Sequence, residues 1–232
     1  MQNLSQGKTK FNSKKARKKP RHFFSHVRFG KKKNMTLSRG LPYFPVMMHI
    51  IEMGNFKDIE KDLIECVYDY RKKDPKGRVI SNEGGWQSSL LHKENNIIRS
   101  TLLGSIAEYF ESNNIFECNI NLDSLWININ GKDHYNKTHN HPLAQLSGVF
   151  WIKTPLNGGK LEFVSPHDFV QAHEMRFYSQ KYKDDNNIFP SYYFNPIAGR
   201  VIIFPSFLLH RVLPNNSDED RISVSFNLLL NK

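Results

Sequence analysis

The stretch RVIIFPSFLLHRVLPNNSDEDRISVSFNLLL, residues 200–230, decides the fold class expected for this chain. Two runs rich in β-branched and aromatic residues, 200–204 and 221–230, enclose a segment rich in Pro, Asn and Asp. Residues of the first kind favour strands, and the enclosed segment has the composition of turns. In the second run polar and apolar side chains alternate, and successive residues of a strand point to opposite faces. The stretch therefore predicts two strands of a sheet with one polar face.

Further runs of the same kind follow residue 119, separated by clusters of Pro, Gly and Asn. These runs are LWINI at 125–129, SGVFWIK at 147–153 and KLEFV at 160–164. Many short strands with turn residues between them are typical of a β-sandwich or jelly roll. We expect Trp126 and Trp151, which lie within two of these strands, to belong to the core.

Two helices are predicted upstream of the strands. Apolar residues recur at helical spacing over 55–70 and 97–110, and Asn55 is a candidate cap for the first helix. The order predicts a mainly β fold with flanking helices: a double-stranded β-helix, jelly-roll or cupin-like, with N-terminal helices packed on one sheet. We expect the Gly-containing segment 81–88 to be a loop, and the polar segment 165–195 to be a lid or substrate loop.

The basic charge of the chain is concentrated at its N-terminus. Residues 1–40 contain 13 of the 33 Lys and Arg and no Asp or Glu, which leaves 20 basic and 22 acidic residues in the remainder. Like charges repel, and the apolar content of this segment is low. We therefore expect a disordered basic tail, 1–40, followed by one domain, 41–232, with a helical part at 41–118 and a barrel at 119–232.

The tail bears on the partners and the location of the protein. Residues 8–39 are a candidate contact for nucleic acid or another anionic surface, and a solvated tail or a start at Met35 are the alternatives. The sequence contains no run of eighteen apolar residues, so we expect no membrane span. It also contains no apolar segment near the N-terminus, so we expect no secretory signal. Cys66 and Cys118 are too isolated for a disulfide framework. We expect an intracellular, cytoplasmic protein, or a nuclear one in a eukaryote.

Three histidines form a candidate metal site. His139 and His141 are two apart in an extended segment, so both imidazoles can point to the same side. His210 lies beyond the strand at 200–204. Imidazole is the commonest metal ligand, and histidines with open coordination positions suit non-haem iron. Structural histidines remain the alternative on spacing alone.

Arg221 and Ser223 form a candidate carboxylate site on the polar face of the last strand. If the apolar face packs on outer helices, these two side chains point into the barrel, where an unpaired charge is costly. A ligand carboxylate fits, because guanidinium binds it through two parallel hydrogen bonds and the hydroxyl adds a third. The alternative is an exposed Arg221 paired with the acidic run 218–220.

The ordered motifs SNEGGWQS, LWININ, HNHPLAQLSGVFWIKTP, FPSFLLHRVLPNN and RISVSFNLL resemble the Fe(II)- and 2-oxoglutarate-dependent oxygenases found widely in bacteria and phages. The resemblance runs from about Phe44 to the end of the chain. It implies a double-stranded β-helix and the cofactors Fe(II), 2-oxoglutarate and O2. It also implies that Arg221 and Ser223 hold the C5 carboxylate of 2-oxoglutarate, and that Asn128 touches the co-substrate.

By the same resemblance, His210 is the distal iron ligand, with His139 and His141 as the other catalytic and metal-binding residues. The wider superfamily has Asp or Glu at the position of His141, so a three-histidine site lacks the negative charge of that carboxylate. Alternatively, only one of the pair binds the metal and a remote carboxylate or water completes the shell.

The function implied is that of a 2-oxoglutarate-dependent dioxygenase. It would hydroxylate a C–H bond of an unidentified small molecule or protein side chain and release succinate and CO2. One alternative is a three-histidine cupin metalloenzyme, such as a thiol dioxygenase, that does not use 2-oxoglutarate. Another is a non-enzymatic jelly-roll protein tethered to nucleic acid by its basic tail.

Overall fold

A computed structural model of the chain describes residues 46–167 and 173–232, so the expected tail at 1–40 lies outside the described residues. In chain order the elements are β1 (His49–Glu52), α1 (Phe56–Lys73), β2 (Asn82–Glu83), β3 (Trp86–Gln87), α2 (Ile97–Ser112), β4 (Asn119–Asn130), β5 (Tyr135–His139), β6 (Leu146–Lys153), β7 (Leu161–Val164), the 3-10 helix η2 (His173–Arg176), α3 (Gln180–Asp185), β8 (Ser191–Phe194), β9 (Arg200–Pro205), β10 (His210–Val212) and β11 (Arg221–Asn231).

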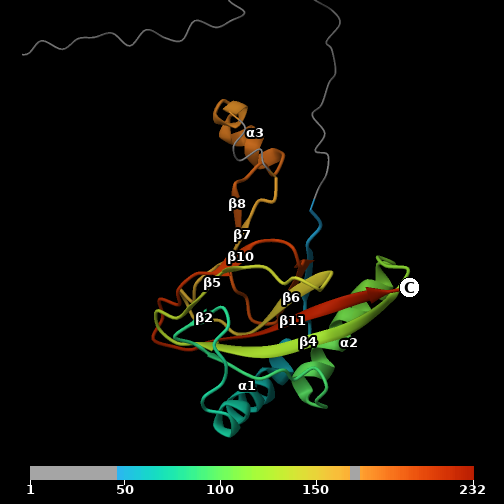
Figure 1. Cartoon of the computed structure of the whole chain (residues 1–232), viewed down its shortest axis with the longest axis vertical. Helices are drawn as coiled ribbons and strands as arrows, with labels where there is room; N and C mark the ends of the chain where they lie inside the picture. The colour runs from blue at the N-terminus through green and yellow to red at the C-terminus, as the bar shows by residue number, and fades with distance from the viewer. Residues whose placement is uncertain (1–45, 168–172) are drawn as a thin grey trace, which may run out of the picture. The chain divides into compact units, whose positions relative to one another are not determined.

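The strands form two antiparallel sheets (Figure 1). One has the order β1-β9-β6-β11-β4-β3, and the other has the order β2-β5-β10-β7-β8. Apolar side chains of β6 and β9 in the first sheet pack against those of β7 in the second. The mainly β architecture predicted from the sequence is confirmed.

Helices α1 and α2 cover the outer face of the larger sheet (Figure 1). Their apolar stripes, which include Leu63 of α1 and Leu102 of α2, are fully buried in one cluster with residues of β4, β6 and β11. Full burial of one such side chain contributes about 1.5–3 kcal/mol. The helix packing predicted from the sequence is confirmed, although α1 begins at Phe56 and Asn55 makes no side-chain capping hydrogen bond.

The two-residue period of the strands divides their side chains between two cores. In β11, Ile222, Val224 and Phe226 join the cluster under the helices. Gly148 of β6 leaves room for the ring of Phe226, which a side chain at Gly148 would overlap. The opposite face of β11 is turned toward the second sheet, and this face carries the polar residues of the motif.

Three segments differ from the simple expectation. The segment 81–88, expected to be a loop, contains the short strands β2 and β3, which pair with β5 and β4. The segment 165–195 contains η2, α3 and β8, and β8 extends the smaller sheet beside β7 (Figure 1). The expected helical part also contributes β1 to the edge of the larger sheet. Within the described ranges, no helix is long and apolar enough to cross a membrane.

Candidate metal centre and cofactor cavity

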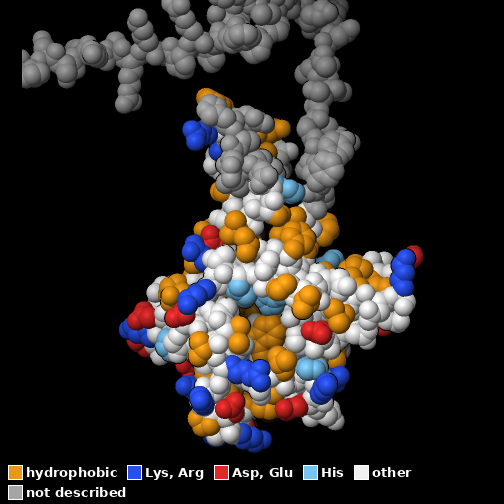
Figure 2. Space-filling view, viewed as in Figure 1, with side chains coloured by type: hydrophobic (Ala, Val, Ile, Leu, Met, Phe, Trp, Pro, Cys, Tyr) orange, Lys and Arg blue, Asp and Glu red, His pale blue; other side chains and the backbone are white. Residues whose placement is uncertain are grey.

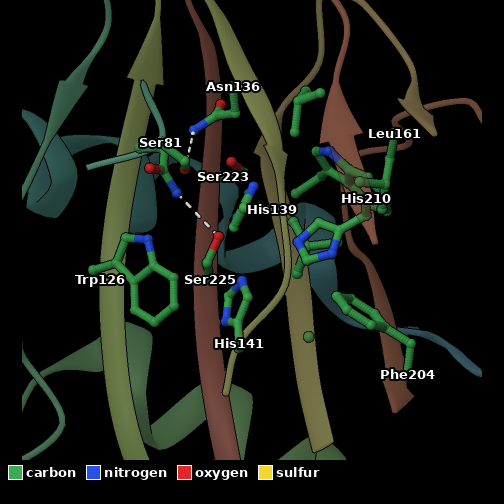
Figure 3. A pocket seen from close by; sticks show the side chains of 15 residues that line it. Ser81, Trp126, Asn136, His139, His141, Leu161, Phe204, His210, Ser223 and Ser225 are labelled. Carbon is green, nitrogen blue, oxygen red and sulfur yellow. Dashed lines mark hydrogen bonds between the residues drawn. The ribbon is translucent and has the colours of Figure 1, made fainter. Parts of the chain in front are cut away.

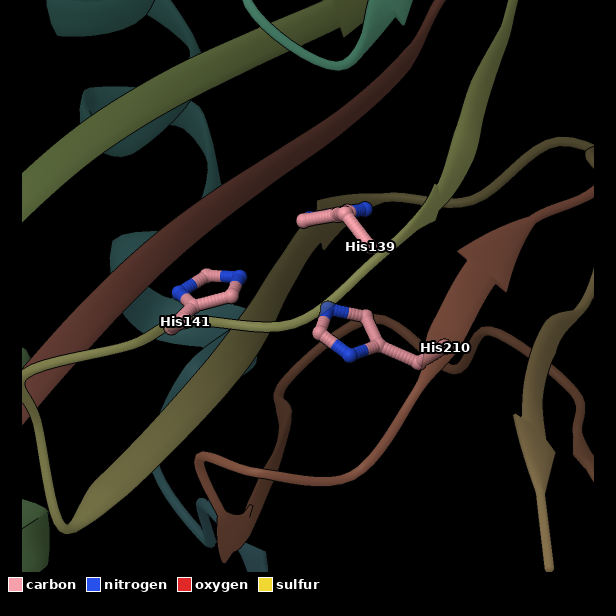
Figure 4. A group of neighbouring side chains, drawn as sticks. All are labelled: His139, His141 and His210. Atoms are coloured by element: carbon pink, nitrogen blue, oxygen red, sulfur yellow. The ribbon is translucent and has the colours of Figure 1, made fainter.

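His139, His141 and His210 come together between the two sheets (Figure 4). His139 ends β5, and His210 begins β10 directly opposite it in the antiparallel register. His141 lies in the turn after β5, where its backbone N–H donates to the carbonyl oxygen of Ser206 at 3.0 Å. One ring nitrogen of each histidine lies within 4.8 Å of those of the other two, so small side-chain rotations would bring all three to one ion.

Each of the three imidazoles has an oxygen atom at its Nδ1. Nδ1 of His139 lies 2.7 Å from the carbonyl oxygen of Lys137, and Nδ1 of His210 lies 2.9 Å from that of Leu208. A carbonyl oxygen only accepts hydrogen bonds, so both Nδ1 atoms carry the hydrogen and leave the Nε2 lone pair free. Histidines that bind metals typically have such a partner on the second nitrogen.

Burial keeps the imidazoles neutral. Desolvation lowers the pKa of His139 below its ordinary value, lowers the pKa of His141 to about 4, and lowers the pKa of His210 to about 3. All three rings are therefore uncharged at pH 7, which is the form that binds a metal. Nε2 of His141 is buried and has no hydrogen-bond partner in the described part of the chain. A metal ion would bind the lone pair of this atom, so the three histidines fit a metal site.

The histidines form one wall of a cavity that is partly open to solvent (Figure 3). The cavity is lined by Ser81, Trp126, Asn128, Asn136, His139, His141, Gly148, Val149, Trp151, Leu161, Phe204, His210, Val212, Ser223 and Ser225. Figure 2 shows the hollow on the surface, with apolar side chains at its floor and histidine side chains at its rim. No acidic side chain lines the cavity within the described residues, so any negative charge must come with a ligand.

Two of the expected cofactor residues line the cavity and one lies behind it. Asn128 and Ser223 face each other across β4 and β11, and both line the cavity. The amide of Asn128 donates to Ser225 Oγ at 3.1 Å, and its Oδ1 is buried with no partner among the residues that the structure describes. Arg221 does not line the cavity. It lies on the same face of β11 as Ser223, two residues before it.

Arg221 is buried, and no carboxylate within residues 46–167 and 173–232 pairs with it. Only 1 % of the residue is exposed, which excludes the alternative of a surface arginine. Nη1 donates to the carbonyl oxygens of Gly158 and Leu213. Nη2 has no partner among the described residues, and burial lowers the pKa of the guanidinium to about 10.

The acidic residues that follow β10 bind other cations. Asp218 pairs with Lys132, and Glu219 pairs with Lys153. Asp220 accepts a hydrogen bond from Tyr68. The alternative reading of an arginine paired with this acidic run is therefore wrong.

Asn130 is a residue of this region that the sequence analysis missed. It pairs with Arg221 in the β4–β11 register, and its Nδ2 is also buried with no partner in the described part of the chain. Buried polar atoms normally have partners, so two unpaired donors on facing residues indicate a place for a polar ligand. The signal was present in the sequence, because Asn130 follows Asn128 by two residues.

Trp126 is a second correction. The sequence analysis assigned it to the core, whereas it is only partly buried and lines the cavity. Its ring stacks on His141 with centroids 5.5 Å apart. Trp86 and Trp151 are buried, and Trp151 also lines the cavity.

Comparison with known families adds independent evidence. The model of a family described as "Putative 2OG-Fe(II) oxygenase" matches residues 124–227, which run from β4 to β11 and include the three histidines and Arg221. Among curated proteins, none matches the sequence significantly.

Several solved structures share the fold. A prolyl-4-hydroxylase from Pseudomonas putida has a TM-score of 0.53 at 12 % identity, covering 81 % of this chain and 93 % of its own. HygX from Streptomyces hygroscopicus, with nickel, 2-oxoglutarate and hygromycin B bound, has a TM-score of 0.54 at 9 % identity, covering 79 % and 82 %. A prolyl hydroxylase from Trichoplax adhaerens, in complex with a peptide fragment of hypoxia inducible factor, has a TM-score of 0.52 at 14 % identity, covering 79 % and 78 %.

At these identities the likeness shows the fold, and it confirms the double-stranded β-helix. The family match covers the strands that hold the histidines, and this family uses Fe(II), 2-oxoglutarate and O2. The match to the 2OG-Fe(II) oxygenase family therefore covers the β-rich part of the chain, residues 124–227.

Proposed function

We propose that the protein binds Fe(II) through His139, His141 and His210 and hydroxylates a C–H bond with 2-oxoglutarate as co-substrate. The observation that carries this proposal is the convergence of three neutral imidazoles on one point. Hydrogen bonds at Nδ1 of His139 and His210 place the ring hydrogen there and leave the Nε2 lone pairs free to bind a metal.

Arg221 is the proposed anchor of the C5 carboxylate of 2-oxoglutarate. Its unpaired Nη2 supports the proposal, because a buried guanidinium without an anion is unstable and a carboxylate would complete it. Ser223, the next inward residue of β11, is a proposed hydroxyl donor to the same carboxylate. Asn130 adds a further proposed donor, since its free Nδ2 lies on the residue opposite Arg221.

Asn128 lies between the proposed anchor and the histidines. The Oδ1 atom of Asn128 is a hydrogen-bond acceptor with no donor among the described residues. We therefore expect this oxygen to accept from a water molecule, or the amide to turn toward the co-substrate. Trp151, Leu161 and Phe204 line the same cavity and limit the water that reaches it. Exclusion of water strengthens every polar contact in the site.

When bound, the iron and 2-oxoglutarate supply the oxidising chemistry: one O2 and one 2-oxoglutarate are consumed, succinate and CO2 are released, and one oxygen atom enters the substrate C–H bond. The protein residues bind and orient these groups. The proposed substrate class is a small molecule or a protein side chain, and the neighbours include one structure with hygromycin B bound and one in complex with a peptide fragment.

The absence of a carboxylate from the histidine cluster has an electrostatic consequence. Three neutral histidines leave the full charge of Fe(II) uncompensated until a dianionic co-substrate arrives. Binding of metal and binding of 2-oxoglutarate should therefore strengthen each other by the same factor, as linkage requires. A site with a carboxylate ligand would show weaker coupling, because part of the metal charge is already balanced.

A three-histidine metalloenzyme that does not use 2-oxoglutarate is the second candidate. The three-histidine set favours it, whereas the buried guanidinium of Arg221 disfavours it, because such an enzyme has no use for a C5 carboxylate anchor. Anaerobically loaded iron protein should be exposed to O2 with and without 2-oxoglutarate. Succinate formation supports the oxygenase, and oxygen uptake that ignores 2-oxoglutarate supports the second candidate.

The basic segment 8–39 is a proposed contact for nucleic acid or another anionic surface. This proposal has support only from the charge of the sequence, which concentrates 13 basic side chains in residues 1–40. Binding through such a segment releases counterions and weakens steeply with salt. Retention on heparin that is equal with and without the segment would contradict it.

A further inference from the structure

Asn227 of β11 lies behind one of the proposed metal ligands. It shares the face of β11 that carries Ser223 and Ser225. Its Oδ1 lies 2.7 Å from Nδ1 of His141. The register between β4 and β11 shifts directly after Asn227, and an irregularity of this kind re-aims the neighbouring side chains. The amide therefore supports His141 from the side away from the other two histidines.

The direction of each hydrogen bond around this amide is fixed by its neighbours. Nδ2 of Asn227 donates to Ser124 Oγ at 2.8 Å. Ser147 Oγ donates to Oδ1 of Asn227, also at 2.8 Å. Since Oδ1 only accepts, Nδ1 of His141 must be the donor in their contact. The hydrogen of the neutral imidazole is thus on Nδ1, and the Nε2 lone pair is free.

Two buried serines complete the network. Ser147 gives its only hydroxyl hydrogen to Asn227, so Ser206 is the donor in the 2.7 Å contact between the two hydroxyls. The backbone carbonyl oxygen of Ser206 accepts from the N–H of His141 at 3.0 Å. His141 is therefore held both at its backbone and at its ring. The chain of hydrogen bonds connects β4, β6 and β11 with the turn that follows β9.

We propose that Asn227 is a positioning residue that fixes the tautomer and ring orientation of His141 so that Nε2 faces the metal. The inference rests on the proposed iron site. It accounts for the buried Nε2 of His141, which has no hydrogen-bond partner in the residues that the structure describes. A neutral amide, rather than a carboxylate, orients the ring without adding charge, so the co-substrate remains the source of negative charge.

The test is titration of metal-free, full-length protein with Co(II), followed by the visible d–d absorption of the bound ion. Asn227→Leu removes the acceptor at similar size and should weaken Co(II) binding about 10- to 100-fold, the usual cost of losing such a partner. Asn227→Asp keeps an acceptor oxygen, and Ser124 Oγ can turn to donate to the second oxygen. Its affinity should equal or exceed that of the unchanged protein.

Asn215→Leu is the matched control. Asn215 is fully buried, and its Nδ2 donates to the carbonyl oxygens of Asn130 and Glu219 but to no histidine. This variant should melt at a lower temperature and still bind Co(II) normally. A purely structural role for Asn227 would instead give Asn227→Leu the same pattern as the control.

Two results would overturn the inference: normal Co(II) affinity in Asn227→Leu, or affinity in Asn227→Asp as weak as in Asn227→Leu. Should Asn227→Leu not fold, Asn227→Ser, whose hydroxyl is too short to reach Nδ1, is judged by the same criteria. Failure of the unchanged protein to bind Co(II) overturns the metal site itself and the positioning role with it. Normal binding by the unchanged protein and by Asn227→Leu leaves the proposed function standing and rejects the role of Asn227 alone.

Discussion

Replacing Arg221 by Met removes a charge that the structure buries without an anion and keeps most of the side-chain volume. The proposed contact is a two-pronged hydrogen bond to the C5 carboxylate of 2-oxoglutarate. Cutting away one partner of such a desolvated pair costs about 2–5 kcal/mol. At about 1.4 kcal/mol per tenfold, 2-oxoglutarate should bind about 30- to 3000-fold more weakly.

The same substitution should leave the folded protein nearly as stable as before. It loses the hydrogen bonds from Nη1 to Gly158 and Leu213, each typically worth about 1 kcal/mol. It also relieves the desolvation of an unpaired charge, and replacing buried charges by apolar side chains is often neutral or stabilising. The melting temperature of the metal-free variant is therefore expected close to that of the unchanged protein.

The assay is titration of the anaerobic iron complex with 2-oxoglutarate, followed by its visible metal-to-ligand charge-transfer band. Arg221→Lys should recover only part of the affinity, because a point charge does not reproduce the guanidinium fork. Ser223→Ala should cost about 1 kcal/mol, since it removes one neutral donor. Normal titration by Arg221→Met, with iron bound and the protein folded, would refute the role of Arg221 and favour the enzyme that does not use 2-oxoglutarate.

Three further predictions concern the metal, the pH and the tail. His139→Ala, His141→Ala and His210→Ala should each abolish tight iron binding. If one of these variants keeps its iron content and turnover, the replaced histidine is not an iron ligand. The folded-state pKa values of His141 (about 4) and His210 (about 3) lie below the unfolded value of about 6.5. The free energy of unfolding that these two neutral histidines contribute is therefore complete above pH 6.5 and falls as the pH drops toward 4. The melting temperature of the metal-free protein should fall accordingly between pH 7 and pH 5. The fall should be shallower in His210→Gln. Deletion of residues 1–34 should leave 2-oxoglutarate turnover unchanged and reduce retention on heparin, and a deletion variant that does not fold would contradict the division into tail and domain.

The two-residue period of β11 made much of the site predictable. Apolar residues alternate with Arg221, Ser223 and Ser225, so the sequence alone indicates which face of the strand looks into the barrel. The same reasoning brought His139 and His141 to one side. Continuing the alternation by one step would have added Asn227, and the corresponding step on β4 would have added Asn130.

Other features depend on contacts between distant segments. The strands β2, β3 and β10 have only two or three residues each, which is too short for a period to be visible. The position of His210 opposite His139 is set by the register of β10 against β5, and register follows from the packed core rather than from local sequence. The partners of Arg221 are backbone carbonyl groups, and no residue type marks such acceptors in advance.

Addition of 2-oxoglutarate to the anaerobic Fe(II) complex, followed by O2, decides whether the protein uses 2-oxoglutarate as its co-substrate. We expect a visible charge-transfer band on binding and, after O2, succinate in an amount equal to the 2-oxoglutarate consumed. We further expect that the band is lost in His210→Ala and shifted to much higher 2-oxoglutarate concentration in Arg221→Met. An iron-loaded protein that develops no band and forms no succinate would show that the proposed 2-oxoglutarate-dependent function is wrong.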